Sequence, residues 1–413
     1  MDRRVLFATL ILFAGGATGV GVALFAFVGI DEGSIEPEIV WETDPVEGDD
    51  GSGAVIAHLD GDSVVVQSTI ADGEREVRAT TVGDGVSWTT PLSTVGIDPP
   101  PDDDPIAISG LESGTLGGDP VVAFTTGSGS LVVLDAADGD ERLAVDIGGP
   151  DEAGGGAVSG GLQPALGDLT GDDRTEIAAV TPDGTVLVVR DDGDTVFETA
   201  LDGSVDRRPL IVEPGDETAG GLAVATVDGD EYTLRLLDER GDARWTTTPE
   251  VTPLSWTAAD TRRGSVLALG GTNGNLETIE TADGSLRYEV GLQDFPVAVG
   301  DSSPGQVHVG GAGSVWSVDL LDGEVAWKQQ YGGQTRVNAP GVGNVAADGT
   351  AGPVAVNRDG DVLVMSRTGE AVARGGIGSA VVYAGPLFAD LTGDGSDEVI
   401  VVAEDGRIVA LAR

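Results

Sequence analysis

The chain has 413 residues and a formal net charge of −48, from 70 acidic and 22 basic residues. A nucleic-acid binder needs basic surface that displaces counterions, so this balance argues against that class of partner. The chain has no cysteine, which excludes disulfides, thiolate metal sites and a cysteine nucleophile. Because 40% of the residues are hydrophobic and fall in strand-like runs, a disordered acidic chain is not expected. At molar salt the Debye length falls to about 3 Å, so this charge is typical of adaptation to high salt.

The N-terminal segment predicts a membrane anchor. Arg3 and Arg4 precede an uncharged apolar stretch, residues 5–30, that is long enough to span a bilayer as one helix. The arginines place residues 1–4 in the cytoplasm and everything after the helix outside the cell. Residues 31–37 read as a short linker. A cleaved signal sequence, or a twin-arginine export signal, is the alternative for the same segment.

Tight turns punctuate the rest of the chain at regular intervals. At Asp183-Gly184 a turn precedes the apolar run 185–189, and a second turn follows at Asp192-Gly193. Such dipeptides favour the positive φ angles of hairpin turns. The layout recurs from Asp72-Gly73 and Asp84-Gly85 to Asp405-Gly406, with copies beginning at Gly129, Asp228-Gly229, Asn273-Gly274, Gly313 and Asp359-Gly360. A period near about 40–50 residues is that of four-stranded propeller blades.

A short strand follows the second turn of each repeat and carries a characteristic side chain. We interpret that side chain as packing between blades, at Trp88, Trp245, Tyr288 and Trp327, with Leu143, Phe197 and Val372 in the equivalent place. The eighth repeat stops at residues 410–413, before its outer strand. Residues 38–43, with Trp41 at the equivalent place, supply that strand. The sequence therefore predicts an all-β fold, a single eight-bladed β-propeller over residues 38–413 closed by its N-terminal strand, with seven blades as the alternative.

The repeats resemble those of quinoprotein-type (PQQ-like) propellers. Residues 318–327 show the pattern of a Leu-Asp strand, a glycine turn and a docking tryptophan. The dehydrogenases of that family bind pyrroloquinoline quinone and calcium in the central funnel, and many also use a pair of adjacent cysteines, which this chain lacks. The same repeat also builds non-enzymatic scaffolds, including envelope assembly factors. The resemblance therefore implies a propeller and favours a scaffold.

Two acidic loops resemble the calcium blades of FG-GAP or integrin-like repeats. Residues 168–176 and 390–398 share the run Asp-Leu-Thr-Gly-Asp and end in Glu before an apolar strand. Calcium takes six to eight hard oxygens, which such a loop offers at alternate positions, the seventh through its backbone carbonyl. Plain polar turns are the alternative, and residues 344–354 read as a degenerate copy without metal. The predicted ligands are Asp168, Thr170, Asp172, Arg174 and Glu176 in the first loop, and Asp390, Thr392, Asp394, Ser396 and Glu398 in the second.

No catalytic arrangement stands out in the sequence. His58 and His308 lie in alternating strand-like sequence and read as ordinary strand residues, and no phosphate-binding glycine loop is present. The pattern as a whole predicts a haloarchaeal-type, membrane-anchored surface protein that holds a protein or glycan partner, with calcium as its cofactor. A PQQ-dependent dehydrogenase is the alternative.

Overall fold

The computed structural model describes residues 37–46, 53–59, 61–82, 85–96, 106–147, 162–215, 220–331, 335–345, 350–378 and 381–413. The predicted anchor at residues 5–30, the cytoplasmic residues 1–4 and all but the last residue of the predicted linker lie outside these ranges. Within them, no helix is long and apolar enough to cross a membrane.

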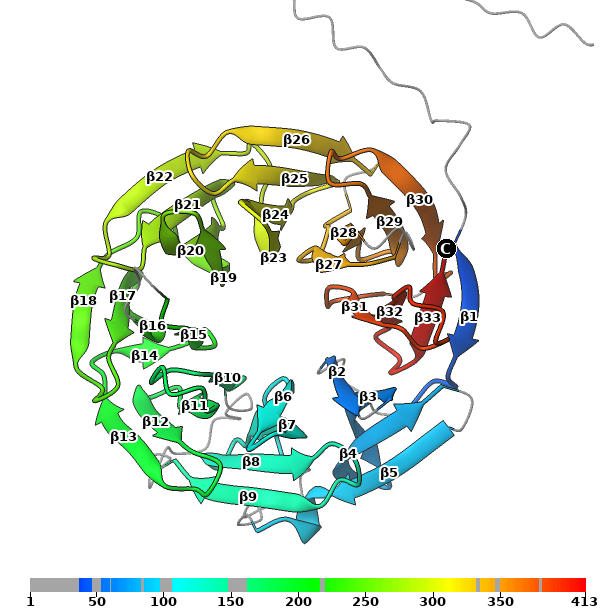
Figure 1. Ribbon diagram of the computed structural model, residues 1–413, viewed down its shortest axis with the longest axis horizontal. Coiled ribbons are helices and arrows are strands. Elements are labelled where there is room, and N and C mark those ends of the chain that lie inside the picture. Colours follow the sequence, from blue (N-terminus) through cyan, green and yellow to red (C-terminus); the bar gives the residue numbers. More distant parts are fainter. Residues whose placement is uncertain are drawn as a thin grey trace, which may run out of the picture. The chain divides into compact units, whose positions relative to one another are not determined.

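Eight antiparallel sheets follow one another around a ring (Figure 1). In the first seven sheets the chain runs from the strand nearest the centre to the strand at the circumference. Blade 1 contains β2 (Ala54–Leu59), β3 (Asp62–Ala71), β4 (Glu74–Thr81) and β5 (Gly85–Pro91), followed by the 3-10 helix η1 (Leu92–Thr94). Blade 2 contains β6 (Glu112–Leu116), β7 (Asp119–Thr125), β8 (Ser130–Asp135) and β9 (Glu141–Asp146). Blade 3 contains β10 (Ala165–Gly167), β11 (Glu176–Val180), β12 (Thr185–Val189) and β13 (Thr195–Ala200).

The next four blades repeat this arrangement. Blade 4 has a divided inner strand, β14 (Ser204–Val205) and β15 (Leu210–Val212), then β16 (Gly221–Asp228), β17 (Glu231–Leu237) and β18 (Ala243–Thr247). Blade 5 contains β19 (Pro253–Thr261), β20 (Gly264–Gly271), β21 (Asn275–Glu280) and β22 (Leu286–Gly291). Blade 6 contains β23 (Ala298–Ser303), β24 (Gln306–Gly310), β25 (Ser314–Asp319) and β26 (Val325–Gln330). Blade 7 contains β27 (Gly341–Gly343), β28 (Gly352–Val356), β29 (Asp361–Met365) and β30 (Ala371–Gly376).

Blade 8 is assembled from both ends of the described chain. It contains β31 (Leu387–Ala389), β32 (Glu398–Val402) and β33 (Ile408–Ala412), and its outer strand is β1 (Glu38–Glu42). Strand β1 pairs antiparallel with β33, with Glu38 opposite Ala412 and Trp41 opposite Ala410, as the blue and red arrows of Figure 1 show. The predicted eight-bladed ring closed by the N-terminal strand is confirmed, and the alternative of seven blades is wrong.

A β-bulge precedes the packing side chain in every outer strand. In blade 1 Val86 pairs with Thr80 and Trp88 with Ala79, which leaves Ser87 as the extra residue. An extra residue of this kind bends a strand and re-aims the side chain after it. We call the residue directly after the bulge the wedge residue. The wedge residues are Trp88, Leu143, Phe197, Trp245, Tyr288, Trp327, Ala373 and Trp41.

The wedge residue of blade 7 corrects the sequence prediction. Ala373 pairs with Val364 and is fully buried, whereas Val372 is the extra residue of the bulge. The prediction of Val372 at this place is therefore wrong by one residue. In blades 2 to 7 the wedge residue follows the turn glycine by four positions, and in blade 7 this spacing from Gly369 gives Ala373.

The wedge residues of blades 1 to 6 pack against the turn glycine of the following blade. The Trp245 indole lies over Gly284, where an added Cβ would come within 2.7 Å of its ring, and its Nε1 donates to the carbonyl of Thr281 at 2.7 Å. Any side chain at Gly284 would displace the indole, so this position requires glycine. The same contact joins Trp88 to Gly139, Leu143 to Gly193, Phe197 to Gly241, Tyr288 to Gly323 and Trp327 to Gly369. The predicted interblade packing of the aromatic side chains is confirmed.

Candidate functional site

The two predicted calcium loops occupy the same place in two blades. Residues 168–176 connect the inner strand β10 to β11 in blade 3, and residues 390–398 connect β31 to β32 in blade 8. Gly171 and Gly393, the fourth residue of each loop, have φ angles of 77° and 74°. Glycine adopts this left-handed conformation without strain, which explains the sharp bend of both loops.

The first aspartate of each loop binds the loop's own backbone. Asp168 Oδ1 accepts from the amides of Gly171 at 2.6 Å and Asp172 at 3.2 Å, and Asp168 Oδ2 accepts from Asp173 at 2.9 Å. In the second loop Asp390 accepts in the same way from the amides of Gly393, Asp394 and Gly395, at 2.7, 3.1 and 2.9 Å. These carboxylates therefore organise the loops, because a carboxylate that accepts several amide N–H groups fixes their positions.

The last glutamate of each loop is buried beneath it. Glu176 is fully buried, and its Oε2 accepts from the amides of Leu169 at 3.0 Å and Thr170 at 3.3 Å, while Thr170 Oγ1 donates to its Oε1. Burial raises the pKa of Glu176 above its ordinary value, and the two amide hydrogen bonds oppose that shift. Glu398 accepts from Leu391 N at 2.6 Å and from Thr392 Oγ1 at 3.1 Å.

The proposed ligands do not gather into a calcium cage in this conformation. Asp172 and Asp394 accept from the amides of Arg174 and Ser396, so the carboxylates of both loops already have donors within the loop. Among the described residues no group of three or more His, Asp or Glu side chains is placed to hold a metal ion. A cation would have to replace some of these amide hydrogen bonds, and calcium binding stays a prediction.

The degenerate loop is attached to the second acidic loop. The amide of Asn344 donates to Asp397 Oδ2 at 2.7 Å, and its Nδ2 donates to the carbonyl of Gly395 at 3.1 Å. Asn344, which the sequence analysis assigned to a turn without metal, thus supports the loop of blade 8.

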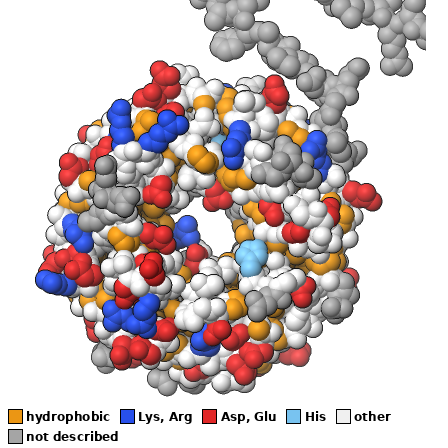
Figure 2. Space-filling view, viewed as in Figure 1, with side chains coloured by type: hydrophobic (Ala, Val, Ile, Leu, Met, Phe, Trp, Pro, Cys, Tyr) orange, Lys and Arg blue, Asp and Glu red, His pale blue; other side chains and the backbone are white. Residues whose placement is uncertain are grey.

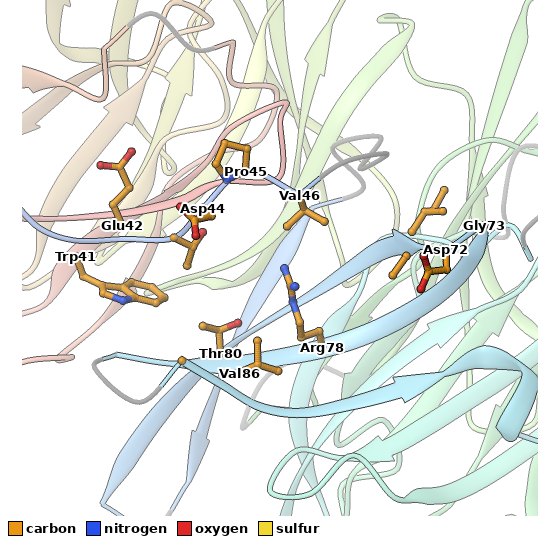
Figure 3. Close-up of a pocket in the computed structure, with 14 residues that line it drawn as sticks. Trp41, Glu42, Asp44, Pro45, Val46, Asp72, Gly73, Arg78, Thr80 and Val86 are labelled. Carbon is orange, nitrogen blue, oxygen red and sulfur yellow. The ribbon is translucent and has the colours of Figure 1, made fainter.

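A groove opens where the ring closes. We call the interface between blades 8 and 1 the closing seam, and a groove of about 820 Å³ lies along it (Figure 3). The Trp41 indole lies on one side, across from Thr80 and Val86, and the Arg78 guanidinium points from β4 toward the chain near Val46. The remaining lining residues are Glu42, Thr43, Asp44, Pro45, Ile70, Ala71, Asp72, Gly73 and Gly85.

Blade 1 lacks the glycine that receives a wedge residue. Four positions before Trp88 the sequence has Asp84, where blades 2 to 7 have glycine, and residue 84 lies outside the described ranges. Strand pairing also differs, since Thr81 pairs with Gly85 and leaves a shorter turn. At Gly85 an added Cβ would have no atom within 4 Å. Trp41 is half-buried and packs against the apolar cluster of blades 8 and 1.

Blade 1 also presents polar side chains to this seam. Thr80 occupies the register position, opposite the residue before the bulge, that is apolar in every other blade. Arg78 lies two residues earlier on the same face of β4. The apolar equivalents of Thr80 are Leu134, Val189, Leu237, Ile279, Val318, Met365 and Leu411. The sequence analysis missed this groove. Thr80, at a position that is apolar in the other blades, was a signal that could have indicated it.

Arg78 is a cation without a partner in the described part of the chain. Its Nε is buried and has no hydrogen-bond partner, and no ion pair forms at its guanidinium. Glu42, a neighbouring acid, pairs with Arg407 instead. Since Asp44 and Asp72 are the other acids that line the groove, its charge is mixed, with Arg78 as its cation.

A second polar group joins the inner strands. Gln163 Nε2 donates to Glu112 Oε2 at 2.6 Å, and Arg208 Nη1 lies 3.5 Å from the same oxygen. Burial raises the pKa of Glu112, while Arg208 and Gln163 oppose the shift. Burial also raises the pKa of Asp301 on β23, against its hydrogen bond from Val342 N. Arg208 offsets the negative charge of these acids, and their hydrogen-bond donors lie within the protein. We therefore interpret this group as structural.

Both histidines lie in strands, as predicted. His58 is exposed on β2, and His308 is buried on β24. The His308 ring stacks on Trp327 with centroids 5.8 Å apart, and burial lowers its pKa to about 4. His308 is thus a neutral core residue at neutral pH.

The ring, its closure by β1 and its wedge contacts define this chain as a closed eight-bladed β-propeller. No family model matches the sequence, and no curated protein matches it. Solved structures do resemble it: BamB from Moraxella catarrhalis is 17% identical, with a TM-score of 0.56, over 92% of this chain and 98% of that one. The C-terminal WD40 domain of Sif2 is 9% identical, with a TM-score of 0.65, over 92% of this chain and 98% of its own. A quinohemoprotein alcohol dehydrogenase from Pseudomonas putida HK5 is 12% identical, with a TM-score of 0.60, over 91% of this chain and 76% of its own. At these identities the likeness shows the fold alone.

Proposed function

We propose that this protein is a membrane-anchored, extracellular scaffold that holds a protein or glycan partner at the cell surface. The closed ring carries the proposal: β1 completes blade 8, so the frame is complete without a ligand. Loops on a rigid frame are free to vary and to bind, which is how propellers generally acquire partners. The similarity to BamB and to a WD40 domain supports a scaffold of this fold.

The sequence supports the location and the salt adaptation of this scaffold. Arg3 and Arg4 before the apolar residues 5–30 favour an uncleaved anchor with the propeller outside. Figure 2 shows acidic side chains spread around the face of the ring, in keeping with the net charge of −48. Circular dichroism across a salt series should show structure gained toward molar salt, because screening reduces self-repulsion. Unchanged stability in dilute buffer would contradict this part of the proposal.

Capture from native membranes tests the scaffold function. Full-length tagged protein, crosslinked on intact cells and purified at constant molar salt, should retain one defined partner. Retention that survives glycan removal identifies a protein, and retention that is lost with the glycan identifies a carbohydrate. Recovery of the protein alone after efficient crosslinking would contradict the scaffold function.

A quinone-dependent dehydrogenase is the second candidate, supported by the similarity to the quinohemoprotein alcohol dehydrogenase over 91% of this chain. The cofactor does not fit the expected pattern, because the chain has no cysteine to form the adjacent pair. Reconstitution with pyrroloquinoline quinone and calcium should give neither quinone absorbance nor dye-linked oxidation of alcohols or sugars. Either signal would favour the dehydrogenase.

A further inference from the structure

We propose that the closing-seam groove binds a peptide segment of a protein partner, one that carries a large apolar side chain next to a carboxylate. The inference rests on the proposed scaffold function and narrows its partner from protein or glycan to protein. It assigns the contact to Trp41, Arg78, Thr80 and Val86, which line one groove.

The apolar part of the ligand follows from comparison with the other blades. Where a wedge residue meets a turn glycine, a large side chain of the protein itself fills the gap, as Trp327 does over Gly369. At the closing seam no described atom lies within 4 Å of the place a Cβ would take at Gly85, and Val86 is 53% exposed. Trp41 forms the opposite wall. A large apolar side chain entering between Trp41 and Val86 would remove both surfaces from water, which is favourable in proportion to the area covered.

The carboxylate follows from Arg78. A buried guanidinium nitrogen without an acceptor is costly, and a carboxylate can satisfy it through two parallel hydrogen bonds. The groove also contains Asp44 and Asp72, so a strongly acidic segment would be repelled. One carboxylate placed at Arg78, beside an apolar residue, satisfies both conditions.

The size of the groove suits a short peptide segment. Its volume of about 820 Å³ falls within the range of about 300–1,000 Å³ typical of ligand sites. A neutral glycan has no carboxylate for Arg78 and no large apolar side chain for the space beside Val86, whereas a peptide can supply both. The mixture of apolar walls and one unpaired cation is therefore better matched by a peptide.

Three labelled peptides with identical Gly-Ser flanks test the proposal. Their central pairs are Glu-Phe, Gln-Phe and Glu-Ala, and binding to the full-length protein is measured by fluorescence anisotropy at fixed ionic strength. The Glu-Phe peptide should bind. The affinity of each of the other two peptides should be lower by about tenfold or more, as expected for loss of a charged hydrogen bond or an apolar anchor. Equal binding of all three peptides, or no binding at millimolar peptide, would overturn the proposal.

Matched arginine variants locate the site. Arg78→Gln should weaken the Glu-Phe peptide about tenfold and leave the Gln-Phe peptide unchanged. Arg235 has the same register position on β17 and donates to Thr226 Oγ1, so Arg235→Gln is the control and should change neither. Thr80→Leu, which restores the residue type of the other blades, should exclude the peptide while the melting temperature is kept or raised. If Arg78→Gln and Arg235→Gln behave alike, the groove is not the site.

The same variants separate this inference from the scaffold function. If Thr80→Leu captures as much partner as the wild type from crosslinked membranes, the groove assignment is wrong and the scaffold stands. If the wild-type protein captures no partner, the scaffold function fails whatever the peptides do. Concentration-dependent dimers that Val86→Arg abolishes would show a second copy of the chain in the groove, and would also overturn the peptide assignment.

Discussion

Two tryptophans hold the same register position in neighbouring blades and meet different surroundings. Trp88 leaves blade 1 after a bulge, packs on Gly139 of blade 2 and is 8% exposed, with its Nε1 donating to the Ala136 carbonyl at 2.9 Å. Trp41 leaves blade 8 after an equivalent bulge, yet it remains half-buried above an open groove. The strand determines where a wedge residue points, and the next blade determines whether it is covered.

The difference originates in how the closing seam is built. In blades 1 to 7 the outer strand follows a hairpin turn of the same sheet, whereas β1 reaches blade 8 from the other end of the chain. Its pairing with β33, the Glu42–Arg407 ion pair and bonds such as Thr43 N to the Ile408 carbonyl at 3.0 Å hold it in place. Closure of the ring therefore depends on noncovalent contacts between the two ends of the described chain.

Among these changes, removal of β1 should cause the largest loss of stability. Deletion of residues 38–43 leaves the edge of β33 unpaired and removes Trp41 from the apolar cluster of the closing seam. The cost should exceed the roughly 3–5 kcal/mol of a single buried Trp→Ala change, because a whole strand is lost. Thermal unfolding in high salt measures it. An unchanged melting temperature would show that β1 does not close the ring.

Substitution of the two tryptophans tests the difference directly. Trp88→Ala should cost about 3–5 kcal/mol, the range for buried Trp or Phe, because it leaves a cavity over Gly139. Trp41→Ala should cost less than half as much, since its indole is only partly buried. Denaturant unfolding at constant ionic strength gives both values. Equal costs would mean that the two seams pack equally well.

Calcium binding compares the loop of blade 3 with the equivalent loop of blade 8. Titration calorimetry of the wild type at fixed ionic strength should find two sites, and Glu176→Gln and Glu398→Gln should each retain one. A ligand that binds only the folded state adds about 2.7 kcal/mol at a hundredfold excess over its Kd. Magnesium should substitute poorly, because it requires a tighter octahedron.

The hydrogen bonds within the acidic loops explain how these loops could be stable if calcium does not bind. If the wild type binds no calcium, the carboxylates of Asp168 and Glu176 hold the loop together by accepting hydrogen bonds from its amides, without a metal. The loops would likewise not be the calcium sites if both Glu176→Gln and Glu398→Gln kept two sites.

Acid should weaken the well-packed region around Trp327 through His308. Burial holds the pKa of His308 at about 4, below its ordinary value of 6.5, so the unfolded chain binds more protons than the folded one between these values. The free energy of unfolding therefore falls as the pH drops through this range, by about 2 kcal/mol at about pH 5. Denaturant unfolding of the wild type and His308→Gln isolates this contribution, because the opposite effects of Glu112 and Glu176 cancel in the difference. Identical pH profiles would contradict it.

Much of the ring could be predicted because its signals are local. A turn glycine such as Gly184 adopts positive φ whatever lies beyond its hairpin, and an alternating apolar strand pairs with its neighbour in sequence. Even the distant pairing of β1 with β33 could be inferred, since the last repeat lacked one strand. The error at Val372 has a local cause too: the larger apolar side chain was favoured over the spacing from the turn glycine.

The groove and the loop geometry depend on contacts between segments that the sequence does not connect. Thr80 and Arg78 become significant only when β4 faces blade 8, where they line one groove with the half-buried Trp41. Likewise the order of Asp, Thr and Glu in the acidic loops is compatible with a cation or with amide hydrogen bonds. Only the folded chain brings Glu176 beneath Leu169 and Thr170.

The sequence by itself thus determined the strands, the number of blades and the closure of the ring, because turn chemistry and strand alternation act over a few residues. The tertiary structure decided which wedge residues are covered, which carboxylates bind their own loop and where a groove remains. These outcomes depend on the side chains that a neighbouring blade presents across a seam, and that neighbour can lie at the other end of the chain, as it does for Trp41 and Thr80.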